Sequence, residues 1–164
     1  AVPAGERPAH ALSRPRLVTG EDVAAAALRL VGVPFRLHGR DPRIGLDCLG
    51  VVALAYGQTT RMPNHYGLRS RGLSPADPIV AAVTESTGLF PVEGSAVPGD
   101  LLMLRPGPCQ VHFALAVGPD RIVHAHAGLR RVVLGPVPQD WPLIGHWRPL
   151  NPQEKTWPRS FSTP

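Results

Sequence analysis

The chain of 164 residues is poor in the residues that mark several common classes of protein. Its two cysteines, Cys48 and Cys109, are too few for a disulfide-built scaffold, although a single bridge between them stays open. Aromatic residues make up 5% and charged residues 18% of the chain, against 43% hydrophobic residues. These proportions predict one globular domain with a buried core, and 20 prolines and 17 glycines predict many loops.

Long apolar runs are also missing. No run approaches the roughly 20 residues that cross a membrane, and the first 18 residues lack the apolar stretch of a signal peptide. We therefore expect no membrane insertion and no signal peptide in this chain.

Lysine is almost absent, because Lys155 is the one lysine among 17 basic residues. The net charge of +5 permits attraction to an anionic polymer such as a cell wall. The arginines stand singly except for Arg130 and Arg131, so the sequence contains no polybasic run. We therefore expect no nucleic-acid partner.

The order of the predicted elements is helices first and strands second. An extended arm (residues 1–18) and an extended tail (151–164) flank a domain over residues 19–150. Thr19 as N-cap, with Asp22 three residues on, predicts the start of a first helix that continues through the helix formers at 23–30. Asp47 caps a helix over 48–56, and a third helix covers 75–87. Short alternating runs after a turn at 98–100 predict an antiparallel meander of five strands, and hence an α+β fold: 101–104, 111–117, 121–125, 131–134 and 143–147.

Cys48 lies in the first turn of a predicted helix. Unpaired amide N–H groups and the positive end of the helix dipole favour a thiolate there, which is the form that attacks carbonyl carbon. The alternative is a small buried hydrophobic residue, since free cysteine is often buried.

His112 lies on a strand whose alternate residues face opposite sides of the sheet. If Val117 pairs with Arg121 across a three-residue turn, His112 falls opposite His126, and His124 shares their face. A nucleophile, a histidine base and a group that orients this base form a cysteine hydrolase site, for which Cys48, His112 and His124 are the candidates. Zinc is the competing interpretation, but the cysteines and histidines lack the usual ligand spacing, so we expect no metal or other cofactor.

These residues resemble the NlpC/P60 cysteine peptidases. The segment GVPFRLHGRDPRIGLDCLGVVALAYG is similar to the segment around that family's nucleophile, PGDLLML to its P-G-D strand, and HFALAVGPDRIVHA to its histidine strand and third catalytic position. The closing WPLIGHWRP is similar to its last strand. The resemblance, over residues 21–149, implies a papain-like fold in which the nucleophile helix packs on an antiparallel sheet.

The resemblance also implies a function: hydrolysis of peptidoglycan stem peptides, without a metal, by Cys48, His112 and His124. It favours His124 over His126 as the orienting residue. Within the family, the chain looks most like the small members found with tails of phages and gene transfer agents. This implies tail proteins as partners and a phage-like particle, made in the bacterial cytoplasm, as the location.

Four residues near the site are candidate substrate contacts. Phe35 stands where the family often has a tyrosine, which removes a hydroxyl, and Leu49 replaces a common serine that contacts a substrate carboxylate. Asp47 is either a simple helix cap or a partner for a free amine of the substrate, and His126 lies beside the histidine pair.

Two further functions remain open. The same fold can serve as a structural tail component with little activity, docking through the arm and the tail, or it can carry an amidase or acyltransferase.

Overall fold

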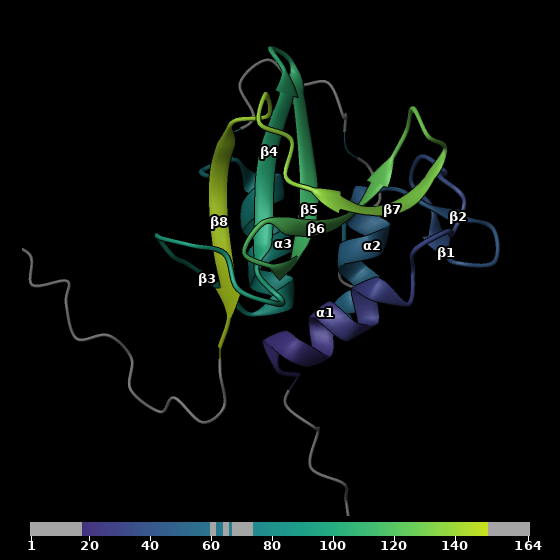
Figure 1. Ribbon diagram of the computed structural model, residues 1–164. Coiled ribbons are helices and arrows are strands. Elements are labelled where there is room, and N and C mark those ends of the chain that lie inside the picture. The colour runs from purple at the N-terminus through teal and green to yellow at the C-terminus, as the bar shows by residue number, and fades with distance from the viewer. Residues whose placement is uncertain (1–17, 60–61, 64–65, 67–73, 151–164) are drawn as a thin grey trace, which may run out of the picture.

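The computed structural model describes residues 18–59, 62–63, 66 and 74–150. Its helices precede most of its strands, as predicted, and the class is α+β (Figure 1). The predicted arm and tail lie outside the described residues, apart from Val18. No helix in the described part of the chain has the length and apolar character needed to span a membrane. The helices are α1 (Gly20–Leu28), α2 (Cys48–Ala55) and α3 (Pro78–Thr87).

The main sheet has six antiparallel strands rather than the predicted five, in the order β3-β8-β4-β5-β6-β7. The strand missed by the sequence analysis, β3, is a short edge strand that pairs only with the end of β8. A separate two-stranded hairpin, β1 (Arg40–Asp41) and β2 (Gly45–Leu46), was also not predicted. The remaining bounds are β3 Leu89–Pro91, β4 Leu101–Gly107, β5 Gln110–Gly118, β6 Arg121–His126, β7 Arg131–Pro136 and β8 Leu143–Pro149.

The predicted helix starts are confirmed where a side chain caps the helix. Thr19 and Asp22 form a reciprocal capping box at α1, and Asp47 caps α2 by accepting the Gly50 N–H. The start of α3 was predicted three residues too early, because Asp77 is its cap and Pro78 occupies the first turn.

The sheet has two buried faces, as the alternation along β5 predicts. Phe113 and Leu115 belong to the main core, which they form with the helices, whereas Ala114 and Ala116 pack in a smaller cluster on the other face. In Figure 1, α2 lies next to β5 and β6, with α1 below it. The side chains at odd positions of β5 therefore anchor α2, and the even positions are left for the opposite face.

Two predicted details of the meander are wrong. The six residues left between the first two predicted strands, 105–110, mostly belong to strands, because β4 continues to Gly107 and β5 begins at Gln110. At the next turn Gly118, rather than Val117, pairs with Arg121, since a β-bulge shifts the register by one residue there. Beyond the bulge the pairing of Leu115 with Val123 restores the predicted register.

The turn before β4 joins three elements through Gly99 and Asp100. Gly99 adopts φ +88°, accepts a hydrogen bond from the Tyr56 hydroxyl at 2.7 Å, and packs against the backbone of Gly20. The buried carboxylate of Asp100 accepts hydrogen bonds from His146 and Arg148 on β8. This turn therefore holds α1, the end of α2 and β8 around the start of β4.

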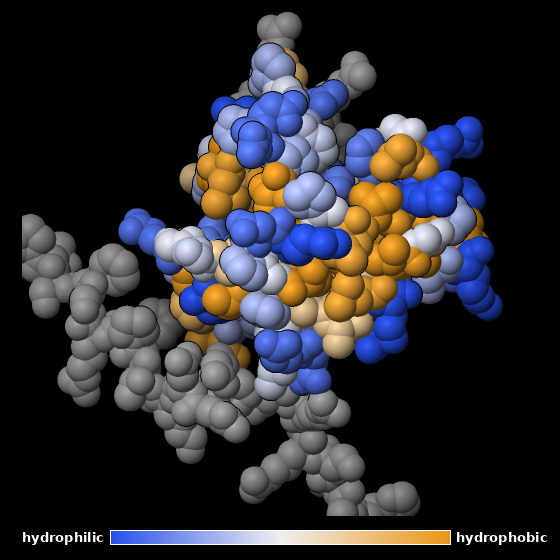
Figure 2. Space-filling view, in the orientation of Figure 1, coloured by the Kyte–Doolittle hydropathy of each residue, from blue (hydrophilic) through white to orange (hydrophobic). Residues whose placement is uncertain are grey.

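One surface of the molecule carries exposed apolar side chains. Figure 2 shows apolar residues gathered over the region of α1 and β7. Large exposed hydrophobic residues there include Leu28, Val31 and Leu134. An exposed apolar face of this kind is suited to contact with another protein.

The contact between Gly99 and Gly20 predicts a large effect of a single methyl group. In Gly99→Ala the new Cβ meets the backbone of Gly20 and the residue keeps a positive φ, so we expect a loss of about 3 kcal/mol in the free energy of unfolding. Gly94→Ala is the matched control, because Gly94 has φ +95° but open space around its Cβ, and we expect about 1 kcal/mol. Urea denaturation measures both; equal losses would contradict the close approach.

Candidate active site

Cys48 lies at the first position of α2, a helix that is buried on every side. Seven of its eight residues are buried, and Cys48 itself is 3% exposed. Gly50 allows this packing, because a Cβ there would collide with the carbonyl oxygen of Gly39 in front of β1. The sequence places Cys48 at a helix start, and the tertiary packing buries this start inside the domain.

The start of α2 lies beside the part of β5 that does not pair with β6. The two strands pair only between Leu115 and Gly118 on β5, so residues 110–114 have no partner in β6. Ala116 donates its N–H to the carbonyl oxygen of Asp100 on the β4 side. Because the N–H groups of successive strand residues point in opposite directions, those at the odd-numbered positions of β5 point toward β6. The Phe113 N–H donates to the sulfur of Cys48, which takes the place of a strand neighbour.

The three histidines predicted on one face lie together. His112 Nε2 and His124 Nδ1 are 2.8 Å apart and hydrogen-bonded across the gap between β5 and β6. His126 makes a different contact, because its Nδ1 accepts the N–H of Leu129 at 3.1 Å. His124 is therefore the histidine that orients the ring of His112, and His126 is held beside the pair.

Trp141 packs against all three imidazole rings from the segment before β8. Its ring centroid lies 5.5 Å from that of His112, 5.7 Å from that of His124 and 6.5 Å from that of His126. The sequence analysis missed this residue, because no local pattern connects the segment before β8 with the histidine strands. Trp141 therefore packs edge-on against both rings of the hydrogen-bonded pair.

The proton positions in the histidine pair follow from the geometry. Burial lowers the pKa of His112 and of His124. The imidazoles of His124 and His126 lower that of His112 further, and His126 lowers that of His124, so both rings are neutral near pH 7. For His112 Nδ1 to accept a proton, its Nε2 must carry the hydrogen that it donates to His124 Nδ1. A neutral His124 supplies the acceptor that this tautomer needs.

The predicted thiolate is wrong for the free protein. Burial raises the pKa of Cys48 to about 12, and the adjacent carboxylate of Asp47 raises it further. Hydrogen bonds from the N–H groups of Phe113 and Leu49 only partly oppose this effect. The helix terminus is where the sequence predicted it, but desolvation outweighs the favourable dipole. The resting site therefore holds a neutral thiol beside a neutral imidazole.

The carboxylate of Asp47 is completely buried and fully hydrogen-bonded. Oδ1 accepts the Gly50 N–H and Arg40 Nη1, both at 2.8 Å. Oδ2 accepts the His38 N–H at 2.7 Å and the hydroxyl of Tyr66. Arg40 and Tyr66 were not singled out from the sequence, since one lies in a short hairpin and the other in an irregular segment.

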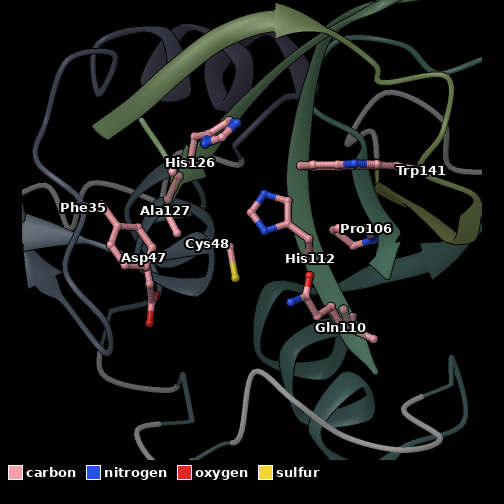
Figure 3. Close-up of a pocket in the computed structure, with 12 residues that line it drawn as sticks. Phe35, Asp47, Cys48, Pro106, Gln110, His112, His126, Ala127 and Trp141 are labelled. Atoms are coloured by element: carbon pink, nitrogen blue, oxygen red, sulfur yellow. The ribbon is translucent and has the colours of Figure 1, made fainter. Parts of the chain in front are cut away.

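A pocket of about 330 Å³ opens over Cys48 and His112 (Figure 3). Phe35 and His126 line it, as expected for substrate contacts, whereas Leu49 is buried in the core and does not line it. Gln110 was missed, although its place two residues before His112 puts both side chains on one strand face. Figure 3 shows its amide directed into the pocket near Cys48 and His112. The pocket wall is otherwise mostly apolar.

A disulfide bridge and a metal site are the two other possibilities that the sequence raises for the cysteines. Cys48 and Cys109 are both free. Within the described ranges, histidine, cysteine and acidic side chains form no group of three or more arranged to hold a metal ion.

Comparison with known proteins finds similarity at the level of structure. No family model matches the chain, and no curated protein matches it in sequence. Similar solved structures include NlpC1 from Trichomonas vaginalis, with a TM-score of 0.56 and 20% identity over 79% of this chain and 43% of that one. An NlpC/P60 family protein from Bacillus cereus has a TM-score of 0.53 and 20% identity, over 78% and 39% of the two chains.

The NlpC/p60 domain of the peptidoglycan hydrolase SagA is matched over its whole length. Its TM-score is 0.54 and its identity 25%, over 81% of this chain and 100% of that domain. The chain spans less than half of the Trichomonas and Bacillus proteins but the complete SagA domain. The chain therefore has the NlpC/P60 fold, as the sequence motifs predicted.

The burial of Cys48 predicts slow chemical modification. Because burial raises the pKa of Cys48, the thiol form predominates at pH 7, and the side chain is barely exposed. We expect iodoacetamide to label the partly exposed Cys109 at least about tenfold faster than Cys48 in the native protein, and both equally in urea. Peptide mass spectrometry measures both rates; faster labelling of Cys48 would contradict the neutral, buried thiol.

Proposed function

We propose that this chain is a cysteine peptidase that hydrolyses stem peptides of peptidoglycan. The observation that carries the proposal is the joint position of Cys48 and the His112–His124 pair at one apolar pocket. A nucleophile, a base and an acceptor that sets the tautomer of the base are the groups that acyl transfer requires.

The neutral site implies that the thiol ionises only when the substrate is bound. Nδ1 of His112 takes the proton from Cys48 as sulfur attacks the carbonyl carbon, and the imidazolium keeps its Nε2 hydrogen bond to His124. His112 then protonates the leaving amine, and water, activated by the same imidazole, hydrolyses the thioester. The Cys48 N–H at the start of α2 and the Gln110 amide are the groups suited to donate to the oxyanion.

The substrate class is supported by the structural neighbours and by charge. The SagA domain, matched over its full length, belongs to a peptidoglycan hydrolase. The net charge of +5 favours approach to an anionic cell wall.

We further propose that the protein works within a phage-like tail and opens the cell wall locally during genome delivery. The motif with Leu49 after Cys48 supports this, because it resembles the tail-associated members of the family. The apolar surface near α1 and β7 supports contact with a tail-tip or hub protein. In this proposal the protein is made in the bacterial cytoplasm and carried in the particle.

Digestion of purified peptidoglycan tests the proposed activity. We expect new stem-peptide fragments, identified by mass spectrometry, from the reduced wild-type protein and from Cys109→Ala, the matched cysteine control. Cys48→Ala is expected to yield none, because it lacks the nucleophile. Fragments from Cys48→Ala would exclude Cys48 as nucleophile. No fragments from folded wild-type protein would instead favour a structural component of the tail.

The roles of the histidines predict an order of effects on kcat/KM. His112→Ala removes the base and is expected to lower kcat/KM at least about 10³-fold, whereas His124→Ala removes only an orienting acceptor and lowers it about 10²-fold. His124→Asn keeps an acceptor and is expected to recover part of this loss. A larger effect of His126→Ala than of His124→Ala would show that the orienting residue has been misassigned.

A further inference from the structure

Asp47 stands directly before the nucleophile, yet it has no hydrogen-bonding capacity left for a substrate. An ionised carboxylate offers about four lone-pair sites. Donors from Gly50, Arg40, His38 and Tyr66 fill two sites on each oxygen, and the side chain is 0% exposed. The acidic side chain nearest to Cys48 is therefore satisfied entirely from within the protein.

The negative charge of Asp47 is also balanced by a positively charged side chain of the protein itself. Arg40 forms an ion pair with it at 2.8 Å, and the side chain of Arg40 is 17% exposed. The guanidinium is fixed by the carbonyl oxygens of Gly39 at 2.7 Å and Pro63 at 3.0 Å. An ammonium group could reach Asp47 only by displacing Arg40, which would leave a half-buried cation without its counter-ion.

The other described residues of the pocket offer no second negative charge to an ammonium group. Cys48 is a neutral thiol and His112 a neutral imidazole near pH 7. Among the described residues that line the pocket, Asp47 is the one acidic residue, and much of the remaining wall is apolar: Phe35, Pro106, Val111, Ala125, Ala127 and Trp141. Placing an ammonium group there would cost its hydration without a compensating charge.

We propose that Arg40 is a specificity-determining residue: it occupies the cation position beside Cys48, so that the pocket takes stem peptides whose amino group is acylated and rejects those with a free ammonium there. This inference rests on the proposed peptidase function. Stem peptide still joined to its glycan strand through an amide has the accepted form, and released peptide with a free amine has the rejected form.

Paired substrates test the inference. Each peptide begins one or two residues before the bond located in the peptidoglycan digest, and is prepared with a free amine or N-acetylated. We expect the wild-type protein to cleave the acetylated form at least tenfold faster in kcat/KM. Equal rates, or preference for the free amine, would overturn the proposal.

Variants of Arg40 connect this preference to the ion pair. Arg40→Met leaves Asp47 without its cation, so a substrate ammonium can replace it and the preference is expected to shift at least tenfold toward the free amine. Arg40→Met combined with Asp47→Asn removes both charges and is expected to fold and to keep the acetyl preference. Arg43→Met is the matched control, because Arg43 forms an exposed ion pair with Asp41 in the same hairpin. An unchanged preference in Arg40→Met would overturn the proposal.

A binding measurement separates failure of this inference from failure of the proposed function. In the background of Cys48→Ala, which cannot turn over, the free-amine peptide is expected to raise the melting temperature of Arg40→Met and to leave that of the protein with Arg40 unchanged. Equal stabilisation of both would overturn the role of Arg40 even if no peptide were ever cleaved. If no peptide were cleaved but the free-amine peptide stabilised only the Arg40→Met protein, the proposed peptidase activity would be refuted and the proposed role of Arg40 in specificity would be supported.

Discussion

The buried carboxylate of Asp47 is the constraint on which the site depends. A helix that enters the core with its N-terminus first brings an anionic cap with it, and a buried carboxylate is tolerated only when it is paired and hydrogen-bonded. The donors come from four separate places in the chain: α2 itself, the segment before β1, β1, and Tyr66. Satisfying one side chain thus assembles the walls around Cys48.

The second constraint is the parting of β5 from β6. Continuous pairing would engage the Phe113 N–H in the sheet and close the space that the sulfur of Cys48 occupies. The side chains of His112 and His124 cross the gap instead, and the Trp141 ring packs against both. Main-chain pairing has been replaced locally by groups that can move a proton, and this is the physical basis of the proposed activity.

Burial underlies both the resting protonation state of the site and the selectivity that we propose for it. Desolvation keeps the thiol and both imidazoles neutral, and it makes an unpaired ammonium group costly in the same pocket. A site of this kind holds no reactive thiolate in the absence of substrate.

The sequence by itself determined what depends on neighbours along the chain. The capping of α1 and α2 and the alternation of β5 predicted the α+β class, because hydrogen bonds and side-chain direction within an element follow from local spacing. The NlpC/P60 fold was predicted from the resemblance of the motifs around Cys48 and His112 to that family. Only the tertiary structure decided the protonation of Cys48, the saturation of Asp47 by Arg40 and Tyr66, and the packing of Trp141 against the histidine pair. Those properties arise from desolvation and from contacts between residues distant in sequence, which no local pattern encodes.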